Sequence, residues 1–228
     1  FTPQFALLKK LDNNSSLYAN AAKSFKMPTF TQIYGGGGAN FAANPLLEPE
    51  EGWTYEFGYK KTSNTSMFKA ALYYMDLDTI EYEGKGTSSN PYVTRNMSFK
   101  NKGLEMTYEK DFGSKYSYSL GANFCNPMGK NKKGVWERKF AREQYNAGIK
   151  YHDAKFNAAL TGMFTTDRAS GWGDLLPVNF IAGYKFDKSS SVELGVENIF
   201  DRDDIVSNPG SATKYYCLPR MVHVTYTY

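Results

Sequence analysis

The residues whose chemistry could support catalysis or metal binding are few and scattered. Asp201, Asp203 and Asp204 could hold a cation, but their spacing differs from that of a calcium-binding loop, so we interpret them as a solvated loop. His152 and His223 lie far apart in sequence, and with no nucleophile placed near either, no hydrolase constellation is predicted. The sequence therefore predicts no catalytic residues, no metal site and no cofactor.

Glycines, cysteines and charge offer no stronger functional signal. The run from Gly35 to Gly38 is followed by no Gly-Lys-Ser or Gly-Lys-Thr and by no expected helix, which favours a flexible loop over a phosphate-binding loop. Cys125 and Cys217 form no CxxC pattern and are interpreted as wall residues of the fold. The formal net charge of +4 is spread along the chain without a basic block, so nucleic acid is not predicted as a partner.

Aromatic residues indicate the fold class. They make up 16% of the 228 residues, yet the mean hydropathy is only −0.54, because the rings alternate with charged and hydroxyl residues. No stretch approaches the roughly 18 consecutive apolar residues that a transmembrane helix needs. The remaining way to cross a membrane is a β-barrel, whose strands alternate apolar and polar side chains and give a bland average hydropathy.

Alternation with a period of two residues is the dominant pattern of the sequence. In 53–60 the odd positions carry Trp53, Tyr55, Phe57 and Tyr59, whereas the even positions carry polar residues or glycine. Similar alternation recurs at 116–124, 156–160, 178–186 and 222–228. Each such segment is predicted to be a strand with one apolar and one polar face. We expect the four rings of 53–60 on the convex, lipid-facing side of a curled antiparallel sheet.

Turn signals divide the chain into about eleven strands. These are expected near 3–11, 16–25, 51–62, 66–80, 95–110, 115–126, 141–151, 155–166, 176–187, 190–200 and 215–228. Tight turns alternate strictly with long polar loops at 26–50, 81–94, 127–140, 167–175 and 201–214. That order is typical of an up-and-down outer-membrane barrel, which has short periplasmic turns and long extracellular loops. The chain is therefore expected to end in the periplasm, with the first strand entering from outside.

An odd number of strands cannot close an up-and-down antiparallel barrel. Because open sheet edges are not tolerated in lipid, the missing strands are expected upstream in a parent protein. The chain begins at Phe1 without a secretory signal, as either a mature or a cut protein could. We therefore expect residues 1–228 to be the C-terminal part of a longer barrel.

Two segments resemble the TonB-dependent receptor family. The first has F-K-M-P at 25–28 and N-P-L-L-E-P-E at 44–50, which is similar to a mid-barrel hallmark of that family. The second has V-E-N-I-F-D at 196–201, followed by a last strand that ends on Tyr228, and it resembles the family's penultimate strand and aromatic C-terminus. Phe is the more usual final residue in the family. The two segments occur in order, and with the strand spacing the resemblance covers essentially the whole chain.

The resemblance implies a function and a set of partners. It implies active import across the bacterial outer membrane of a scarce ligand, such as a ferric siderophore, haem or cobalamin, driven by TonB through an N-terminal plug that this chain does not contain. Outer-membrane lipid and the outer-membrane assembly machinery are the other implied partners, the latter recognising the last strand through Val222, Val224, Tyr226 and Tyr228. A small outer-membrane enzyme and a passive porin or adhesin barrel are the alternatives from other classes.

The long loop at 26–50 bears on the ligand. Haem receptors of the family often carry an iron-ligating His there, whereas the stretch from Thr29 to Ala43 contains none and offers Tyr34 instead. Iron chelates are typically anionic and often aromatic, so loop tyrosines and cations could meet them by stacking and charge attraction. The predicted ligand-binding residues are Tyr34, Tyr82, Tyr92 and Arg95, with Lys85, Lys130, Lys132, Lys133 and Arg168 as further loop cations. A ferric siderophore is therefore the predicted ligand.

Overall fold

The computed structural model describes residues 1–36, 40–84, 86–168, 172–210 and 213–228. One large antiparallel sheet dominates it, in the strand order β1-β2-β3-β4-β5-β6-β9-β10-β11-β12-β15. These strands are β1 (Gln4–Lys10), β2 (Ser15–Lys26), β3 (Glu50–Thr62), β4 (Ser66–Glu83), β5 (Val93–Phe112), β6 (Tyr116–Cys125), β9 (Glu143–His152), β10 (Phe156–Thr166), β11 (Val178–Lys185), β12 (Ser191–Glu197) and β15 (Met221–Thr227). The expected all-β, up-and-down sheet of about eleven strands is confirmed along this path.

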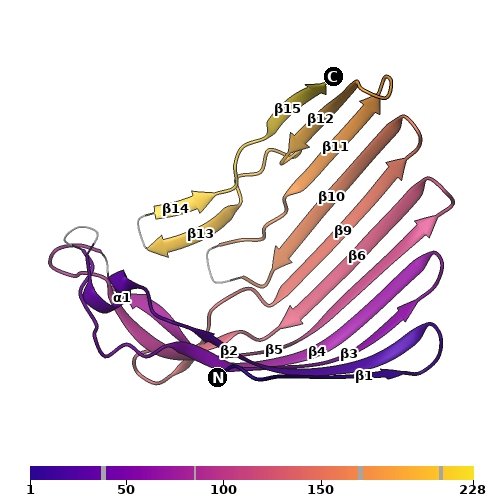
Figure 1. The fold of residues 1–228 in the computed structure, drawn as a ribbon. Helices are drawn as coiled ribbons and strands as arrows, with labels where there is room; N and C mark the ends of the chain where they lie inside the picture. The colour runs from indigo at the N-terminus through magenta and orange to yellow at the C-terminus, as the bar shows by residue number, and fades with distance from the viewer. Residues whose placement is uncertain (37–39, 85, 169–171, 211–212) are drawn as a thin grey trace.

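The sheet curls into an open trough with two different ends (Figure 1). At the turn end, short connections join β1 to β2, β3 to β4, β5 to β6, β9 to β10 and β11 to β12. At the loop end lie the helix α1 (Phe30–Tyr34) and two hairpins, β7 (Met128–Lys130) with β8 (Trp136–Arg138), and β13 (Ile205–Gly210) with β14 (Thr213–Tyr216). The strict alternation of short and long connections is thus present in three dimensions. Within the described residues no helix is long and apolar enough to cross a bilayer.

Aspartate side chains fix three of the tight turns. Asp12 Oδ1 accepts hydrogen bonds from the backbone N–H groups of Asn14 and Ser15, both at 2.7 Å. Asp153 and Asp187 likewise accept hydrogen bonds from the backbone N–H groups of the second and third residues that follow each of them. Such bonds imitate a backbone turn, which is why Asp is favoured there. Hydrogen bonds from the Ser190 side chain and from Ser189 lower the pKa of Asp187 to about 2, so this carboxylate stays charged at neutral pH.

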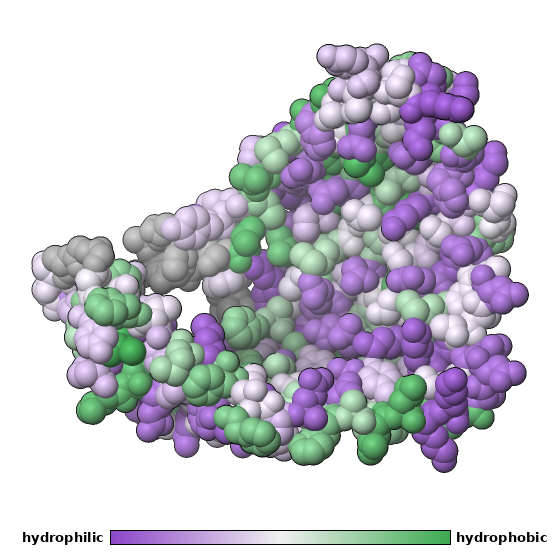
Figure 2. Space-filling view, in the orientation of Figure 1, coloured by the Kyte–Doolittle hydropathy of each residue, from purple (hydrophilic) through white to green (hydrophobic). Residues whose placement is uncertain are grey.

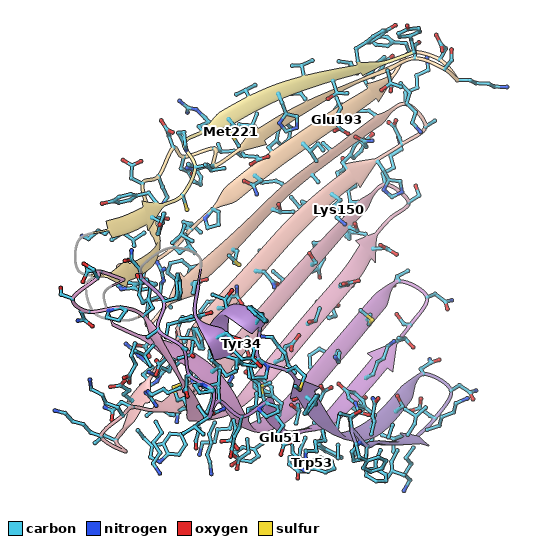
Figure 3. All side chains as sticks on the ribbon, turned by 60° about the vertical axis from the view of Figure 1, so that its left-hand side comes forward. Tyr34, Glu51, Trp53, Lys150, Glu193 and Met221 are labelled. Carbon is cyan, nitrogen blue, oxygen red and sulfur yellow. The ribbon has the colours of Figure 1, made fainter. Side chains whose placement is uncertain are left out.

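The register places apolar residues of neighbouring strands opposite one another on one face of the sheet. Tyr55 of β3 lies opposite Tyr74 of β4, and their rings stack with centroids 6.5 Å apart. Phe57, one step along the same face, is 54% exposed, so the predicted aromatic row is not packed in an internal core. Trp53 lies on the convex side of the curved sheet (Figure 3). The convex placement predicted for the row at 53–59 is therefore confirmed.

The opposite face lines the hollow and is largely hydrophilic (Figure 2). Lys150 and Glu193 lie on this side (Figure 3). On the polar face, large side chains lie over glycines of the neighbouring strand. The Tyr18 ring, for example, lies so close to Gly58 that a Cβ there would come within 2.2 Å of it. Glycine in a strand often marks such a close approach. The polar face is therefore packed, although it carries few apolar residues.

The structure differs from the sequence-based expectations at the loop end. No helix was expected in the loop at 26–50, but α1 forms there, with Thr29 and Gln32 exchanging the two hydrogen bonds of a capping box. Five residues are too few to give a helical period. The strand expected at 215–228 is shorter and begins at Met221, because Tyr215 and Tyr216 belong to the β13–β14 hairpin.

We predict that Phe57→Lys destabilises the barrel, because it places a charge in the middle of the lipid-facing row. The expected loss is about 2–4 kcal/mol, the cost of Lys near the bilayer midplane. Urea unfolding of the full-length protein in lipid vesicles would measure it. Thr54→Lys, on the polar face of the same strand, is the matched control and should cost far less. Equal losses for the two variants would contradict the assignment of the faces.

Candidate functional site

The loop between β2 and β3 is fixed to the projecting end of the β4–β5 hairpin. Thr94 Oγ1, which is buried, donates a hydrogen bond to the backbone oxygen of Gln32 at 3.0 Å. Asn44 Nδ2 donates to the backbone oxygen of Thr94 at 2.7 Å. The Asn96 side chain accepts from the N–H of Glu48 and donates to its carbonyl, at 3.0 and 2.9 Å. The loop is thus held by specific polar contacts, which position its aromatic residues.

Two groups of aromatic rings result at the loop end. Tyr82 of β4 and Tyr92, just before β5, both pack on Phe41, with ring centroids 6.0 and 5.3 Å away. Tyr34, the last residue of α1, lies beside Phe30 with centroids 4.6 Å apart. Tyr34 is 62% and Tyr82 49% exposed. The structure therefore brings Tyr82 and Tyr92 together, places Tyr34 in a separate pair, and adds Phe41, which the sequence analysis did not single out.

Arg95 lies in an ion-pair network. It stands directly opposite Glu81 in the β4–β5 ladder, and its guanidinium reaches Glu81 at 2.6 Å and Glu83 at 2.5 Å. Lys139 contacts Glu81 at 2.7 Å and Glu137 at 3.1 Å. Although burial opposes its charge, hydrogen bonds to these two carboxylates raise the pKa of Lys139. Three carboxylates therefore outnumber two cations, and Arg95 is compensated within its strand pair instead of being a loop cation available to an anion.

A small apolar pocket adjoins this network. It has a volume of about 520 Å³ and is lined in part by Leu77, Met97, Phe99 and Phe140, with Lys139 beside them. Met97 and Phe99 are buried, whereas Phe140 is exposed and lies edge-on to Phe99 with ring centroids 6.0 Å apart. Leu77, Met97 and Phe99 alternate in register with Arg95 on the face that lines the trough. An apolar wall beside charged groups suits a ligand that is partly aromatic and partly polar.

Of the other predicted cations, Lys130 contacts this network through its backbone oxygen, which accepts a hydrogen bond from the Arg95 guanidinium at 3.4 Å. Lys130 lies in β7, Lys132 and Lys133 lie in the turn between β7 and β8, and Arg168 stacks over Trp172 with 5.2 Å between its Cζ and the ring centroid. Lys85 lies outside the described residues.

The aspartates at 201–204 take structural roles. Asp204 accepts hydrogen bonds from the side chain of Arg202 at 2.8 Å and from the N–H of Leu176 at 2.8 Å. Asp201 accepts from the N–H of Arg220 at 2.8 Å. These bonds tie the segment after β12 to its neighbours. In the part of the chain that the structure describes, no three His, Cys, Asp or Glu side chains gather to hold a metal ion.

The predicted assembly residues lie at the edge of the sheet. Val222, Val224 and Tyr226 alternate along β15 and are exposed. Tyr228 follows the strand, and its ring stacks on that of Tyr226 with centroids 6.3 Å apart. Within the described residues, β15 pairs only with β12.

This architecture defines a class of protein. A curved antiparallel sheet with an apolar convex face, a polar hollow, short turns at one end and long loops at the other is the wall of an outer-membrane β-barrel. Residues 1–199 match the family described as TonB dependent receptor-like, beta-barrel. The chain belongs to this family, whose members are outer-membrane receptors and transporters rather than enzymes.

Solved structures share the fold at low sequence identity. A variant of the ferric enterobactin receptor PfeA of Pseudomonas aeruginosa has a TM-score of 0.77 and 18% identity, with 99% of this chain and 40% of that chain covered. The copper transporter OprC has a TM-score of 0.76 and 14% identity, with 98% of this chain and 38% of that chain covered. The ferric citrate transporter FecA has a TM-score of 0.74 and 18% identity, with 99% of this chain and 37% of that chain covered. The chain therefore spans about two fifths of the length of these proteins.

We predict that Arg95→Met loosens the end of the β4–β5 hairpin, because it leaves Glu81 and Glu83 side by side without their shared cation. An uncompensated carboxylate of this kind costs about 1–3 kcal/mol, which corresponds to cleavage about 5- to 150-fold faster between β4 and β5. Limited proteolysis of intact cells would measure the rate. Lys60→Met at the turn end is the control, and Arg95→Met combined with Glu83→Met should recover part of the protection. A wild-type cleavage rate in Arg95→Met would show that the network does not hold the hairpin.

Proposed function

We propose that the protein containing this chain imports a scarce metal chelate across the outer membrane by TonB-driven transport, and that the chelate is of the ferric-siderophore type. Family membership supports the transport class. The observation that carries the choice of ligand is the exposure of tyrosine rings in both aromatic groups at the loop end, Tyr34 in one and Tyr82 in the other. Exposed tyrosine rings held by a fixed loop and a strand end can stack on the planar groups of an aromatic chelate.

The charges at the loop end refine the proposed contact set. Tyr34, Tyr82 and Tyr92 provide ring faces, while Arg95 acts as an anchor of the hairpin because its charge is already compensated by Glu81 and Glu83. Positive charge for an anionic chelate then comes from the turn between β7 and β8, which carries Lys132 and Lys133. Attraction by such a group raises the local concentration of an anionic ligand.

The composition of the α1 loop favours a siderophore over haem. The stretch from Thr29 to Ala43 contains no His, and His is a common axial ligand of haem iron. Tyr34 could ligate iron as a phenolate instead. Its ring lies beside Phe30 and is largely exposed, which favours stacking. Three of the solved neighbours are named for ferric enterobactin, ferric citrate and ferripyoverdine, and none of these names assigns a ligand to this chain.

We also propose that residues 1–228 are the C-terminal part of the complete barrel. The eleven strands of the main path alternate in direction, so β1 and β15 run the same way. Closure as an antiparallel barrel therefore needs an odd number of further strands between them. On this proposal those strands and the plug lie upstream of Phe1, and the plug supplies the contact with TonB.

Growth of an iron-starved parent strain tests the ligand class. A strain that lacks this gene should lose growth on siderophore-bound iron and keep growth on haem. Loss of growth on haem alone would overturn the choice of ligand. Equal growth of both strains on every iron source would count against import of iron.

Variants at Tyr34 separate stacking from iron ligation. Tyr34→Phe keeps the ring and should retain ligand affinity, whereas Tyr34→Ala should weaken binding by about 2- to 10-fold, the range expected for one aromatic contact. Loss of binding in both variants would indicate a phenolate ligand. Equilibrium binding of the full-length receptor to a ferric catecholate chelate is the measurement.

The last strand is proposed as the recognition signal for the outer-membrane assembly machinery. The alternating row of Val222, Val224 and Tyr226 lies on β15, the edge strand of the described sheet, and ends on the largely exposed Tyr228. Until the complete barrel closes, such an edge strand offers unpaired N–H and C=O groups to which another strand can add.

Deleting Tyr228 from the full-length protein should therefore lower the amount of assembled barrel in the outer membrane several-fold. The heat-modifiable gel mobility of membrane fractions reports the assembled form. Tyr216→Ala, at the loop end, serves as the control for loss of one exposed tyrosine. An unchanged yield of assembled protein without Tyr228 would refute the signal.

A further inference from the structure

A cationic and aromatic patch lies on the convex surface near the loop end. This Trp136 patch consists of Lys100 and Lys102 of β5, Lys130 of β7 and Trp136 of β8. The ammonium groups of Lys100 and Lys130 lie 5.7 and 6.0 Å from the centroid of the Trp136 ring. Trp136 itself is 38% exposed. The ammonium groups of two lysines therefore lie close to one accessible indole ring.

Contacts show that the patch shares the face of the lipid-facing rings. The Lys100 ammonium lies 3.2 Å from the Asp76 carboxylate, which also accepts a hydrogen bond from the Tyr74 hydroxyl at 3.3 Å. Tyr74 stacks on Tyr55, a member of the aromatic row at 53–59. Lys102 lies directly opposite Tyr74 in the β4–β5 ladder. The Trp136 patch therefore continues the membrane-contacting band toward the loop end, on the side that faces away from the hollow.

The charge of the patch is only partly compensated. Lys100 is paired with Asp76, whereas Lys102 and Lys130 have no carboxylate within 4.0 Å among the described residues. Both of these lysines are exposed. At this level of the barrel the convex surface leaves the apolar band and meets the lipid headgroups. Lysines at such a boundary keep their stems against apolar surface and direct their ammonium groups to anionic groups.

We propose that the Trp136 patch binds the phosphate groups of anionic lipid headgroups in the leaflet at the loop end. Lys102 and Lys130 supply the charge, and Trp136 supplies an interfacial ring beside Lys130. The imported ligand is not the occupant, because the patch faces outward from the barrel and the proposed ligand site lies at the loops and the hollow. The inference rests on the place of the barrel in the outer membrane and holds whichever ligand is imported.

The test compares lipid binding by variants of the full-length receptor in detergent micelles. The probe is lipid A carrying two phosphates, and native mass spectrometry or a fluorescent lipid A reports binding. K102E/K130E should bind it at least about tenfold more weakly, because two cations near an anionic headgroup become anions. K102R/K130R should bind like the wild type. K102Q/K130Q removes the two charges without reversing them and should also bind lipid A more weakly than the wild type. It replaces K102E/K130E in the test if that variant does not fold.

The matched control is K9E/K110E. Lys9 and Lys110 occupy the same convex face by register, but at the turn end, so this variant carries the same charge change away from the patch and should bind normally. Lipid A stripped of phosphate should bind wild type and K102E/K130E alike. Equal binding of phosphorylated lipid A by wild type, K102E/K130E and K102Q/K130Q would overturn the proposal, as would equal wild-type binding of phosphorylated and phosphate-free lipid A. Heat-modifiable mobility confirms that each variant is folded.

Discussion

The structure depends on one constraint, which is that a backbone inside a bilayer must satisfy its N–H and C=O groups within the protein. Eleven strands meet it by pairing with their neighbours in one continuous ladder. Because side chains alternate across a strand, the same ladder separates an aromatic face from a polar one. Turns and loops then take opposite ends, since every connection must leave the hydrocarbon before the chain reverses.

The wall and the candidate site are parts of the same strands. β4 and β5 have 18 and 20 residues, well beyond the roughly 9–11 that a tilted transmembrane strand needs. The excess projects at the loop end as a hydrogen-bonded hairpin that carries Arg95 and Glu81 and receives the α1 loop through Thr94 and Asn96. A site on rigid elements holds its side chains more accurately than one on free loops. The ion pairs there thus stabilise the platform that presents the tyrosines.

Local pattern predicted the wall, and distant contacts determine the site. The rings at 53–59 reveal their strand because a period of two is visible in the sequence itself. The compensation of Arg95 follows from the register of β4 and β5, although the positions of Glu81 and Arg95 on either side of one loop could have suggested it. The α1 helix is too short for a periodic signal, and its position depends on Thr94, which lies about sixty residues away. Phe41 lies in a loop and belongs to no periodic sequence pattern that would have marked it as part of the site.

The three aspartate-fixed turns have a consequence for how the wall forms. Asp12, Asp153 and Asp187 each bind N–H groups only two and three residues ahead, so these hairpins can choose their pairing before any distant strand arrives. That choice is decisive, because a slip of one residue would exchange the lipid-facing and polar faces. Most strands of the main path pair with their nearest neighbours in sequence, which keeps loop-closure entropy small. The wall is therefore suited to stepwise growth, with each hairpin serving as the template on which the next one aligns.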